Sequence, residues 1–515
     1  MEYKQYEVIK HNVGFLLLNF VLNLKDSYHY RTNHKSIELS EDQKLVADDL
    51  FKRIQECRHS FVEGCGIGDG RGYFSYDLSH DNPNLFNEYH VRCGGEIPRF
   101  EADDKLLELL VTILIREFPN LLVTSKYLTP DNVLNYGVSQ LEKETFVRLV
   151  KEDQVDSLTN HEEGNLYSFY FQTDDGHSFG ESVVFSLVGI IGRSFRNACF
   201  KNNLSYEGVI EEIKENLNIL RNLALGNEVE YSSFVSVVGL SLNKVKKIDF
   251  ISAKLINMLK IDDEGNVIRL PSVRHYSASG GLYTAETVFE IKHKTKFLPF
   301  GDEAELANNR FFVQERAIDN LKFSLAFELL GEIGISVSFS EFGFPLLSCG
   351  NSSLDTSMPN RHVSIQEDRI EGVVTWFNML LNKDLRSIEV PLTRLKYAIY
   401  ERKRPQDAFV DAVIAWEAIF SDKLETTFQV TSSIAVYIYN VKEREDRYGR
   451  LKKLYGWRSN LVHGTMPNEL KKQNIEEISL EAIEVGIICL KKLLQDEILL
   501  PLKPAARVKR LLVMK

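Results

Sequence analysis

The stretch YGWRSNLVHGT (residues 455–465) contains two residues whose types and spacing suggest chemistry. Arg458 interrupts an apolar run, and His463 follows it by five residues, directly before Gly464. A guanidinium binds carboxylates and phosphates through several N–H groups, and an imidazole gains or loses a proton near neutral pH. We therefore take Arg458 and His463 as the first candidates for a functional site.

Arg458 points inward if this region is helical. A helix over 443–463 has an apolar stripe formed by Leu451, Leu454, Tyr455, Leu461 and Val462, and Arg458 falls within it. Glu417 falls within the apolar stripe of an earlier helix, 407–421. Because an unpaired buried charge is costly, we predict that Glu417 and Arg458 contact each other. The pair is either purely structural or one in which Glu417 orients an arginine that reaches a groove.

His463 stands at the predicted end of the same helix, because Gly464 follows it directly and Pro467 is close behind. Taken alone, a histidine at this place is best explained by the favourable carbonyl ends of the helix. Five residues also turn a regular helix by about 140°. Arg458 and His463 therefore share a face only if the last turn distorts or if two copies of the chain meet.

The segment Arg458-Ser-Asn-Leu-Val-His463 resembles the signature of the HEPN superfamily, in which four to six residues separate an arginine from a histidine. The stretches RPQDAFVDAVIAWEAIF (404–420) and LKKLYGWRSNLVHG (451–464) resemble the Apea-like HEPN group, over roughly 385–497. Ser459 departs from the Asn, Asp or His that is commoner after the arginine. Asn460 is then the candidate for the supporting hydrogen bonds.

The resemblance implies a metal-independent endoribonuclease that uses no cofactor, of the kind found as an effector in toxin, abortive-infection and other antiphage defence systems. It implies that His463 acts as a general base on the 2′-OH or as a general acid toward the 5′ oxygen, with Arg458 holding the scissile phosphate. The product is a 2′,3′-cyclic phosphate. Such domains dimerise, so RNA and a second copy of the chain are the implied partners.

Basic residues precede the candidate pair along the same predicted helix. Lys452, Lys453 and Arg450 are the candidates for contact with the RNA backbone, and Arg444 and Arg447 lie further upstream. The alternative is that these residues only form the solvated face of a helix.

Two differently built regions surround these residues. Up to about residue 350, helical patterns at 1–25, 40–57, 104–117 and 205–225 are mixed with strand patterns at 165–185, 260–270, 287–300 and 335–342. After a polar segment, only helices are predicted, at 364–382, 391–403, 406–421, 425–440, 443–463 and 474–497. The predicted fold is a mixed α/β N-terminal region, possibly of two subdomains, followed by an all-α bundle.

The chain of 515 residues is too long for one ordinary core. We predict a mixed region at 1–350 with a sensor or regulatory role, a connector at 351–375 and a HEPN-like helical domain at 376–515. The sign of the net charge also changes between these two parts of the chain. Residues 376–515 carry 24 Lys and Arg against 18 Asp and Glu, or +6, whereas the remainder carries 38 against 55, or −17. Polyanion binding is therefore expected only at the back.

Several other classes of function lack the residues that they need. The chain has no GxxxxGK[ST] phosphate loop, no GxSxG elbow and no HExxH zinc motif. Its six cysteines form no CxxC pair, which favours a reducing compartment such as the cytoplasm. The apolar run at 14–24 is too short to span a bilayer, and we expect a buried helix there rather than a membrane segment.

Two other interpretations remain open at this point. In the first, the C-terminal helical domain is a HEPN-type module that is not catalytic and serves dimerisation or partner binding. Glu417–Arg458 is then a structural pair, and the N-terminal region senses a ligand. In the second, the N-terminal region carries the main activity, for example ligand binding, and the helical domain only reports it. No sequence motif supports or excludes this.

Overall fold

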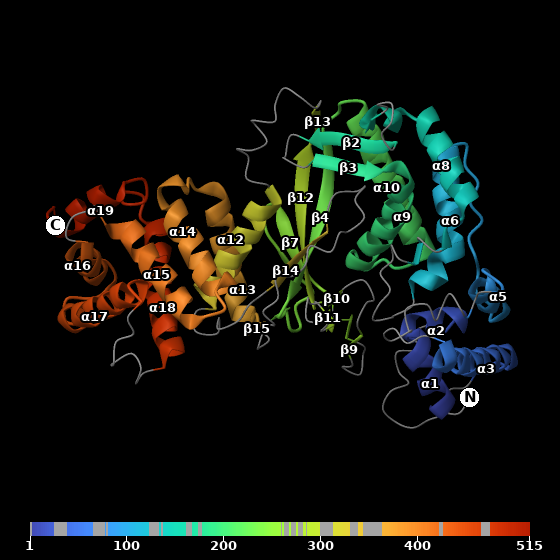
Figure 1. Ribbon diagram of the computed structural model, residues 1–515, viewed down its shortest axis with the longest axis horizontal. Coiled ribbons are helices and arrows are strands. Elements are labelled where there is room, and N and C mark those ends of the chain that lie inside the picture. Colours follow the sequence, from blue (N-terminus) through green and yellow to red (C-terminus); the bar gives the residue numbers. More distant parts are fainter. Residues whose placement is uncertain are drawn as a thin grey trace. The chain divides into compact units, whose positions relative to one another are not determined.

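The computed structural model (Figure 1) describes most of the chain. The described residues are 3–24, 39–64, 78, 81–122, 133–134, 137–160, 167–173, 178–258, 260–261, 267–268, 274–276, 282–284, 286–298, 313–329, 338–342, 363–421, 426–464 and 474–514.

The chain forms two compact units that are not continuous in sequence. Unit 1 comprises Met1–Ser236, Met258–Phe312 and Ser340–Leu354. Unit 2 comprises Val237–Asn257, Val313–Phe339 and Asp355–Lys515. The mixed front and the helical back predicted from the sequence are both present, but the chain crosses between the units more often than a single connector allows.

Unit 1 is built mainly from helices around one hydrophobic core. These helices are α1 (Tyr3–Val13), α2 (Phe15–Val21), α3 (Glu41–Gly64), α5 (Leu85–Arg92), α6 (Lys105–Leu121), α8 (Gln140–Glu152), the short η3 (Gln154–Leu158), α9 (Val183–Phe200) and α10 (Tyr206–Ala224). At the start of α10, the Ser205 side chain accepts a hydrogen bond from the backbone of Gly208 and so caps the helix.

The hydrophobic run at 14–24 becomes α2, whose Leu17, Leu18 and Val21 are buried, as expected. Helix α9 is the one described helix long and apolar enough to cross a membrane, and 89% of it is buried inside the structure. The sequence patterns did not single out α9, in which the polar side chains of Arg193, Arg196 and Asn197 are buried along with the apolar ones.

Strands follow the predicted segments and add others that were not predicted. A four-stranded sheet joins β1 (Thr159–Asn160), β2 (Ser168–Thr173), β3 (Ser178–Ser182) and β13 (Phe297–Leu298). The predicted hairpin at 165–185 is β2–β3, antiparallel with Ser168 opposite Ser182; its Asp-Gly turn lies outside the described residues. A five-stranded sheet has the order β14 (Ser338–Phe342), β4 (Val229–Val238), β12 (Thr287–Thr295), β7 (Ala253–Asn257), β6 (Lys247–Asp249).

Shorter strand pairs complete the β structure of the described chain. They are β8 (Lys260–Ile261) with β9 (Val267–Ile268), β10 (Arg274–Tyr276) with β11 (Leu282–Thr284), and β5 (Leu240–Ser241) with β15 (Val363–Ser364). The last pair is parallel, and the other two are antiparallel.

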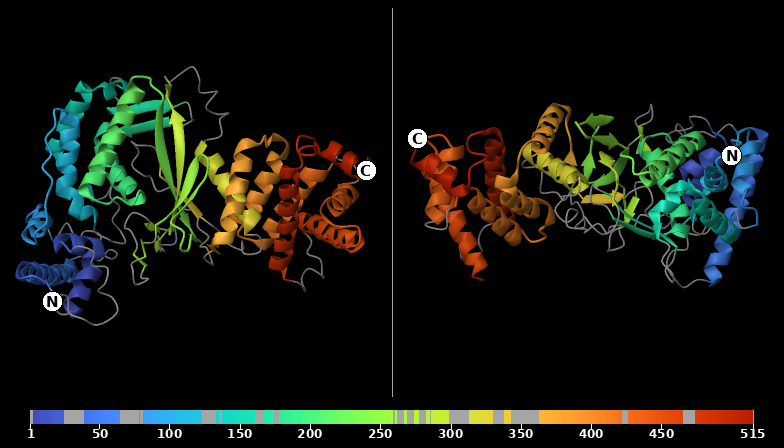
Figure 2. Two further views of the ribbon diagram at one scale, coloured as in Figure 1. Left: turned by 180° about the vertical axis from the view of Figure 1, so that it is seen from behind. Right: turned by 90° about the horizontal axis from the view of Figure 1, so that it is seen from above.

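Unit 2 contains a helical bundle (Figure 2) with its own hydrophobic core, and strands β5, β6, β7 and β15 also belong to this unit. Its helices are α12 (Val313–Glu328), α13 (Glu367–Asn382), η5 (Arg386–Ile388), α14 (Glu389–Lys396), the π-helical turn η6 (Tyr397–Glu401), α15 (Pro405–Phe420), α16 (Thr426–Ile438), α17 (Arg444–Val462), α18 (Ile475–Gln495) and α19 (Pro504–Leu512). Every helix predicted after residue 364 is present within a few residues of its predicted ends, and α19 is an addition.

The predicted domain limit at residue 376 is wrong. Helix α12 belongs to the bundle, because its Phe323 and Phe327 lie in the same core as Trp376 of α13. The Trp376 indole also donates to Glu328 at 2.5 Å. The predicted connector at 351–375 is partly corrected in the same way: 351–362 lie outside the described residues, but 363–364 are β15 and 367–375 are the first turns of α13.

Candidate functional site

Helices α15 and α17 place the predicted ion pair inside unit 2. Pro405 opens α15 at a position where a missing N–H costs nothing, and buried residues follow along the helix. The Arg458 Nη2 donates to Glu417 Oε2 at 2.9 Å, which confirms the contact inferred from helical periodicity. Both side chains are 20% exposed, so the pair lies at the edge of the core rather than in its centre.

Tyr455 completes this arrangement, although its place in the apolar stripe predicted only a core residue. Its hydroxyl donates to the other oxygen of the same carboxylate, Glu417 Oε1. Burial, together with this hydrogen bond, raises the pKa of the Tyr455 hydroxyl above its ordinary value. The signal available in the sequence was spacing, because Tyr455 precedes Arg458 by three residues and so shares its helix face.

Arg458 keeps donors that the pair does not use. Its Nε is buried and has no hydrogen-bond partner among the described residues. A buried donor without an acceptor is unfavourable, and such groups call for an explanation. The pair with Glu417 therefore leaves one donor of the Arg458 guanidinium unsatisfied within the described part of the chain.

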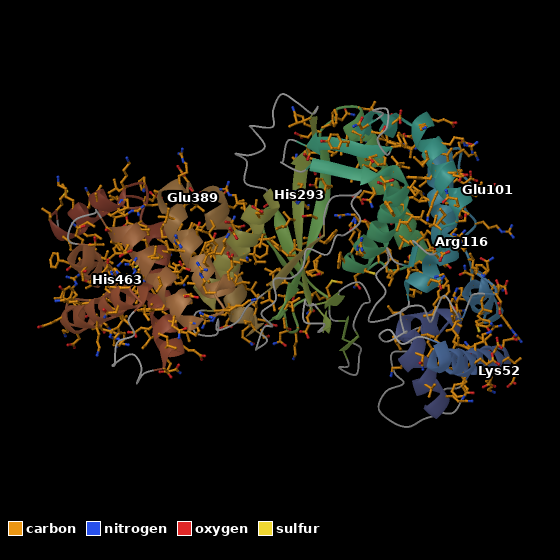
Figure 3. All side chains as sticks on the ribbon, in the orientation of Figure 1. Lys52, Glu101, Arg116, His293, Glu389 and His463 are labelled. Atoms are coloured by element: carbon orange, nitrogen blue, oxygen red, sulfur yellow. The ribbon has the colours of Figure 1, made fainter. Side chains whose placement is uncertain are left out.

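His463 lies at the end of α17 and is exposed (Figure 3). Its backbone N–H donates to the Ser459 carbonyl at 3.2 Å, so the last turn keeps the regular helical bond. Gly464 then takes φ +74°, the left-handed conformation that commonly ends a helix. Because the turn is not distorted, Arg458 and His463 stay on different faces and one chain does not bring them together.

The two residues after Arg458 differ in their surroundings. Ser459 is half-buried, and Asn460 is exposed on the outer face of α17. Both lie three or four residues before His463, so they occupy the face of His463 rather than that of Arg458.

The candidate RNA-binding residues separate into two groups. Lys452 and Lys453 are exposed, and Lys453 lies 5.1 Å from the ring centre of Trp457. Arg450 instead forms a two-pronged pair with Glu481, in which Nη2 lies 2.5 Å from Oε2 and Nε lies 2.9 Å from Oε1. Arg450 is therefore largely engaged within the bundle, and the lysines are the better placed of the three to meet a phosphate backbone.

The upstream arginines also have structural contacts. Arg444 donates to the carbonyl oxygens of Val436 and Tyr439 at 3.3 Å, where it closes the end of α16. Arg447 stacks on the Tyr439 ring at 5.2 Å. These contacts fix the α16–α17 hairpin, and they favour a structural role for this part of the basic run.

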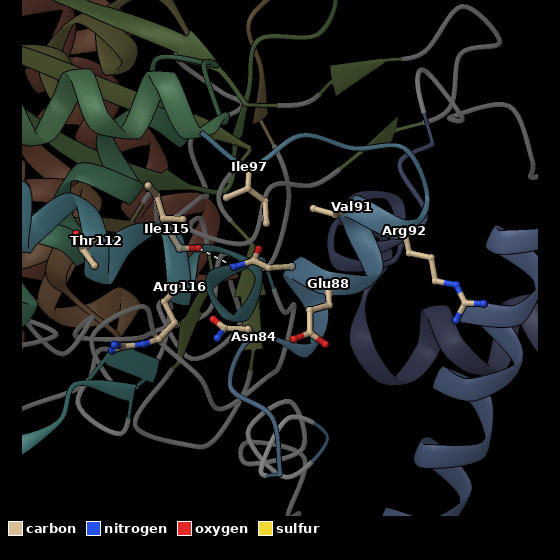
Figure 4. A pocket seen from close by; sticks show the side chains of 9 residues that line it. Asn84, Glu88, Val91, Arg92, Ile97, Thr112, Ile115 and Arg116 are labelled. Atoms are coloured by element: carbon tan, nitrogen blue, oxygen red, sulfur yellow. Dashed lines mark hydrogen bonds between the residues drawn. The ribbon is translucent and has the colours of Figure 1, made fainter. Parts of the chain in front are cut away.

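Unit 1 has a separate cavity of about 620 Å³ between α5 and α6 (Figure 4). Val91, Ile97 and Ile115 give it an apolar wall. Its Asn87 donates to the Ile115 carbonyl at 3.0 Å and accepts from Tyr206. Arg116 is bound to Glu142 at 2.6 Å. Because these polar groups are engaged, the cavity suits an apolar ligand better than a charged one. It identifies no reaction.

Within the described part of the chain, no group of three or more His, Cys, Asp or Glu side chains converges in a way that could hold a metal ion. A comparison of the whole chain with protein-family models, curated proteins and solved structures found no match.

Proposed function

We propose that this protein is a metal-independent endoribonuclease of the HEPN type. Arg458 binds the scissile phosphate and stabilises the charge that grows on its oxygens, and His463 moves a proton to or from the ribose oxygens. The 2′-OH attacks the phosphate, the 5′ oxygen leaves with a proton, and a 2′,3′-cyclic phosphate remains. The observation that carries the proposal is the Arg458 guanidinium, which is part-exposed and bound to Glu417 while its buried Nε has no partner among the residues that the structure describes.

The active form is a homodimer. Helix α17 stays regular to its end, so Arg458 and His463 are about 140° apart around it. A second copy that approaches the end of α17 sets its own His463 beside Arg458 of the first. Lys452 and Lys453 then extend the positive charge along the strand of RNA. Unit 1 acts as the regulatory region, and the whole is an effector of the toxin or antiphage defence class.

A second candidate is a non-catalytic helical module for dimerisation or partner binding. It is favoured by one observation, the completed contact of Glu417 with both Arg458 and Tyr455, because a carboxylate with two partners is also what a purely structural pair requires. In that case His463 is only a solvated helix end, and replacing it leaves RNA untouched.

An RNA-cleavage assay with the purified full-length protein and its variants decides between these two candidate functions. Wild type, Arg458→Ala, His463→Ala and the control Lys509→Ala, which changes an exposed residue of α19, are incubated with total RNA in the presence of a chelator. We expect cleavage by wild type and Lys509→Ala, products that end in a cyclic phosphate, and loss of cleavage in the other two. Equal cleavage by all four, or a requirement for added metal, would refute the proposal.

A further inference from the structure

Helix α17 carries two arginines that meet carboxylates in different ways. Arg450 takes both oxygens of Glu481, with Nε 2.9 Å from Oε1 and 3.1 Å from Oε2, and Nη2 2.5 Å from Oε2. This two-pronged geometry is the one that a guanidinium and a carboxylate prefer. Arg458, eight residues later, reaches only one oxygen of Glu417, through one nitrogen.

The difference between the two pairs lies in Tyr455. Its hydroxyl donates to Glu417 Oε1 and so fixes the orientation of the carboxylate, in which only Oε2 meets Arg458. Tyr455 is 7% exposed, and burial beside Glu417 raises the pKa of its hydroxyl, so it remains a proton donor throughout the physiological pH range. Arg458 consequently has no acceptor for its Nε among the described residues.

We infer that Tyr455 is a positioning residue for RNA binding and cleavage: by holding one oxygen of Glu417, it prevents the carboxylate from closing on Arg458 with both oxygens and keeps the guanidinium available to a phosphate. This inference rests on the proposed function. A residue that only packed the core would instead stabilise the fold and leave phosphate binding unchanged.

The test replaces Tyr455 with Phe in the full-length chain. Without the hydroxyl, Glu417 closes on Arg458 in the two-pronged manner of Glu481 and Arg450. We expect kcat/KM for RNA cleavage to fall about tenfold, the amount that corresponds to one charge-assisted hydrogen bond. Affinity for a short single-stranded RNA, measured in a His463→Ala background, falls by a similar factor. The thermal midpoint changes little, because the new ion-pair contact offsets the lost hydrogen bond.

Two further variants separate positioning from packing. Tyr448→Phe is the matched control, since Tyr448 is a half-buried tyrosine of the same helix, and it leaves cleavage and affinity unchanged. The double variant Tyr455→Phe, Glu417→Gln regains most of the lost RNA affinity, because an amide has only one oxygen and cannot hold the guanidinium in the two-pronged way. Failure of this rescue would overturn the inference, as would a Tyr455→Phe protein with a lowered midpoint and wild-type RNA affinity.

Nuclear magnetic resonance of labelled arginine tests the geometry independently of any activity. In Tyr455→Phe, rotation about the Arg458 Nε–Cζ bond slows, because both oxygens of the Glu417 carboxylate now bind the guanidinium. Equal rotation rates in wild type and variant would overturn the inference. If wild type neither binds nor cleaves RNA, the proposed function fails by itself, whereas the resonance experiment still decides whether Tyr455 keeps Arg458 from closing on Glu417.

Discussion

Replacement of Glu417 by Ala tests the energetics of the α15–α17 contact. It leaves the Arg458 charge without its partner and the Tyr455 hydroxyl without its acceptor. Loss of one partner from a fully buried pair costs about 3–5 kcal/mol, whereas a fully exposed pair contributes about 0–1 kcal/mol. Because both side chains are 20% exposed, we expect a cost of about 2–3 kcal/mol, of which the lost tyrosine bond contributes about 1 kcal/mol.

The assay is urea unfolding of the full-length chain, followed by a signal that reports the helical unit. Trp416 and Trp457, which are buried in this unit, supply it through their fluorescence. Arg386→Ala is the control, since the pair of Arg386 with Asp384 has side chains that are 89% and 59% exposed, and its removal leaves the midpoint unchanged. A loss below about 1 kcal/mol for Glu417→Ala would show that the pair contributes no more than a fully exposed one and would contradict the prediction.

Three other substitutions test the packing of the same unit. Gly456→Ala raises the free energy of unfolding by about 1 kcal/mol, because a methyl group there meets no neighbouring atom within 4 Å. Gly486→Ala lowers the free energy of unfolding by about 1–3 kcal/mol, because its methyl group would lie 2.9 Å from Leu395. Thermal midpoints that moved in the same direction for both variants would contradict this. Arg507→Met lowers the free energy of unfolding by about 3 kcal/mol, because buried carbonyl oxygens lose their donor. The control Lys509→Met changes an exposed residue and has no such effect. Equal urea midpoints for the two variants would contradict this.

The Arg507 prediction follows from an unusual environment. The side chain is fully buried, and its N–H groups donate to the carbonyl oxygens of Leu499 at 3.0 Å and Leu500 at 2.8 Å. Burial lowers the pKa of Arg507 to about 10, so the side chain stays charged at neutral pH. Its stabilising bonds are therefore constant from pH 5 to about pH 9, and the effect of Arg507→Met is the same over that range.

The Glu417–Arg458 contact was predictable because helical periodicity assigns each residue to a face. A charge within an apolar stripe requires a partner, and the two helices each offered one. Tyr455 was not recognised, since an aromatic residue in that stripe is explained equally well by packing, and only the structure shows where its hydroxyl points. The engagement of Arg450 by Glu481 of α18 was not predicted, because Arg450 belongs to a basic run that was expected to meet RNA or solvent and so required no partner within the protein.

The extent of unit 2 was not predictable from local patterns. Helix α12 has a weak contrast between its faces, and its membership depends on Phe323 and Phe327 meeting residues of α13. Strand β6 was missed because it has only three residues, and β4 because its last six residues are all buried, which removes the alternation that marks a strand. Tertiary contacts decided each of these cases.

The assembly of unit 2 from separated stretches has a consequence for the synthesis of the protein. The Lys491 ammonium donates to the carbonyl oxygen of Phe327, 164 residues earlier, and Lys491 also lies 3.5 Å from Glu328. During translation, α12 must therefore wait for α18 before its core is complete, since long-range contacts form last. The helices that carry Glu417 and Arg458 gain their full support only after the ribosome has made α18. A fragment that begins at residue 376 lacks this support, and its bundle should expose the apolar residues that α12 covers.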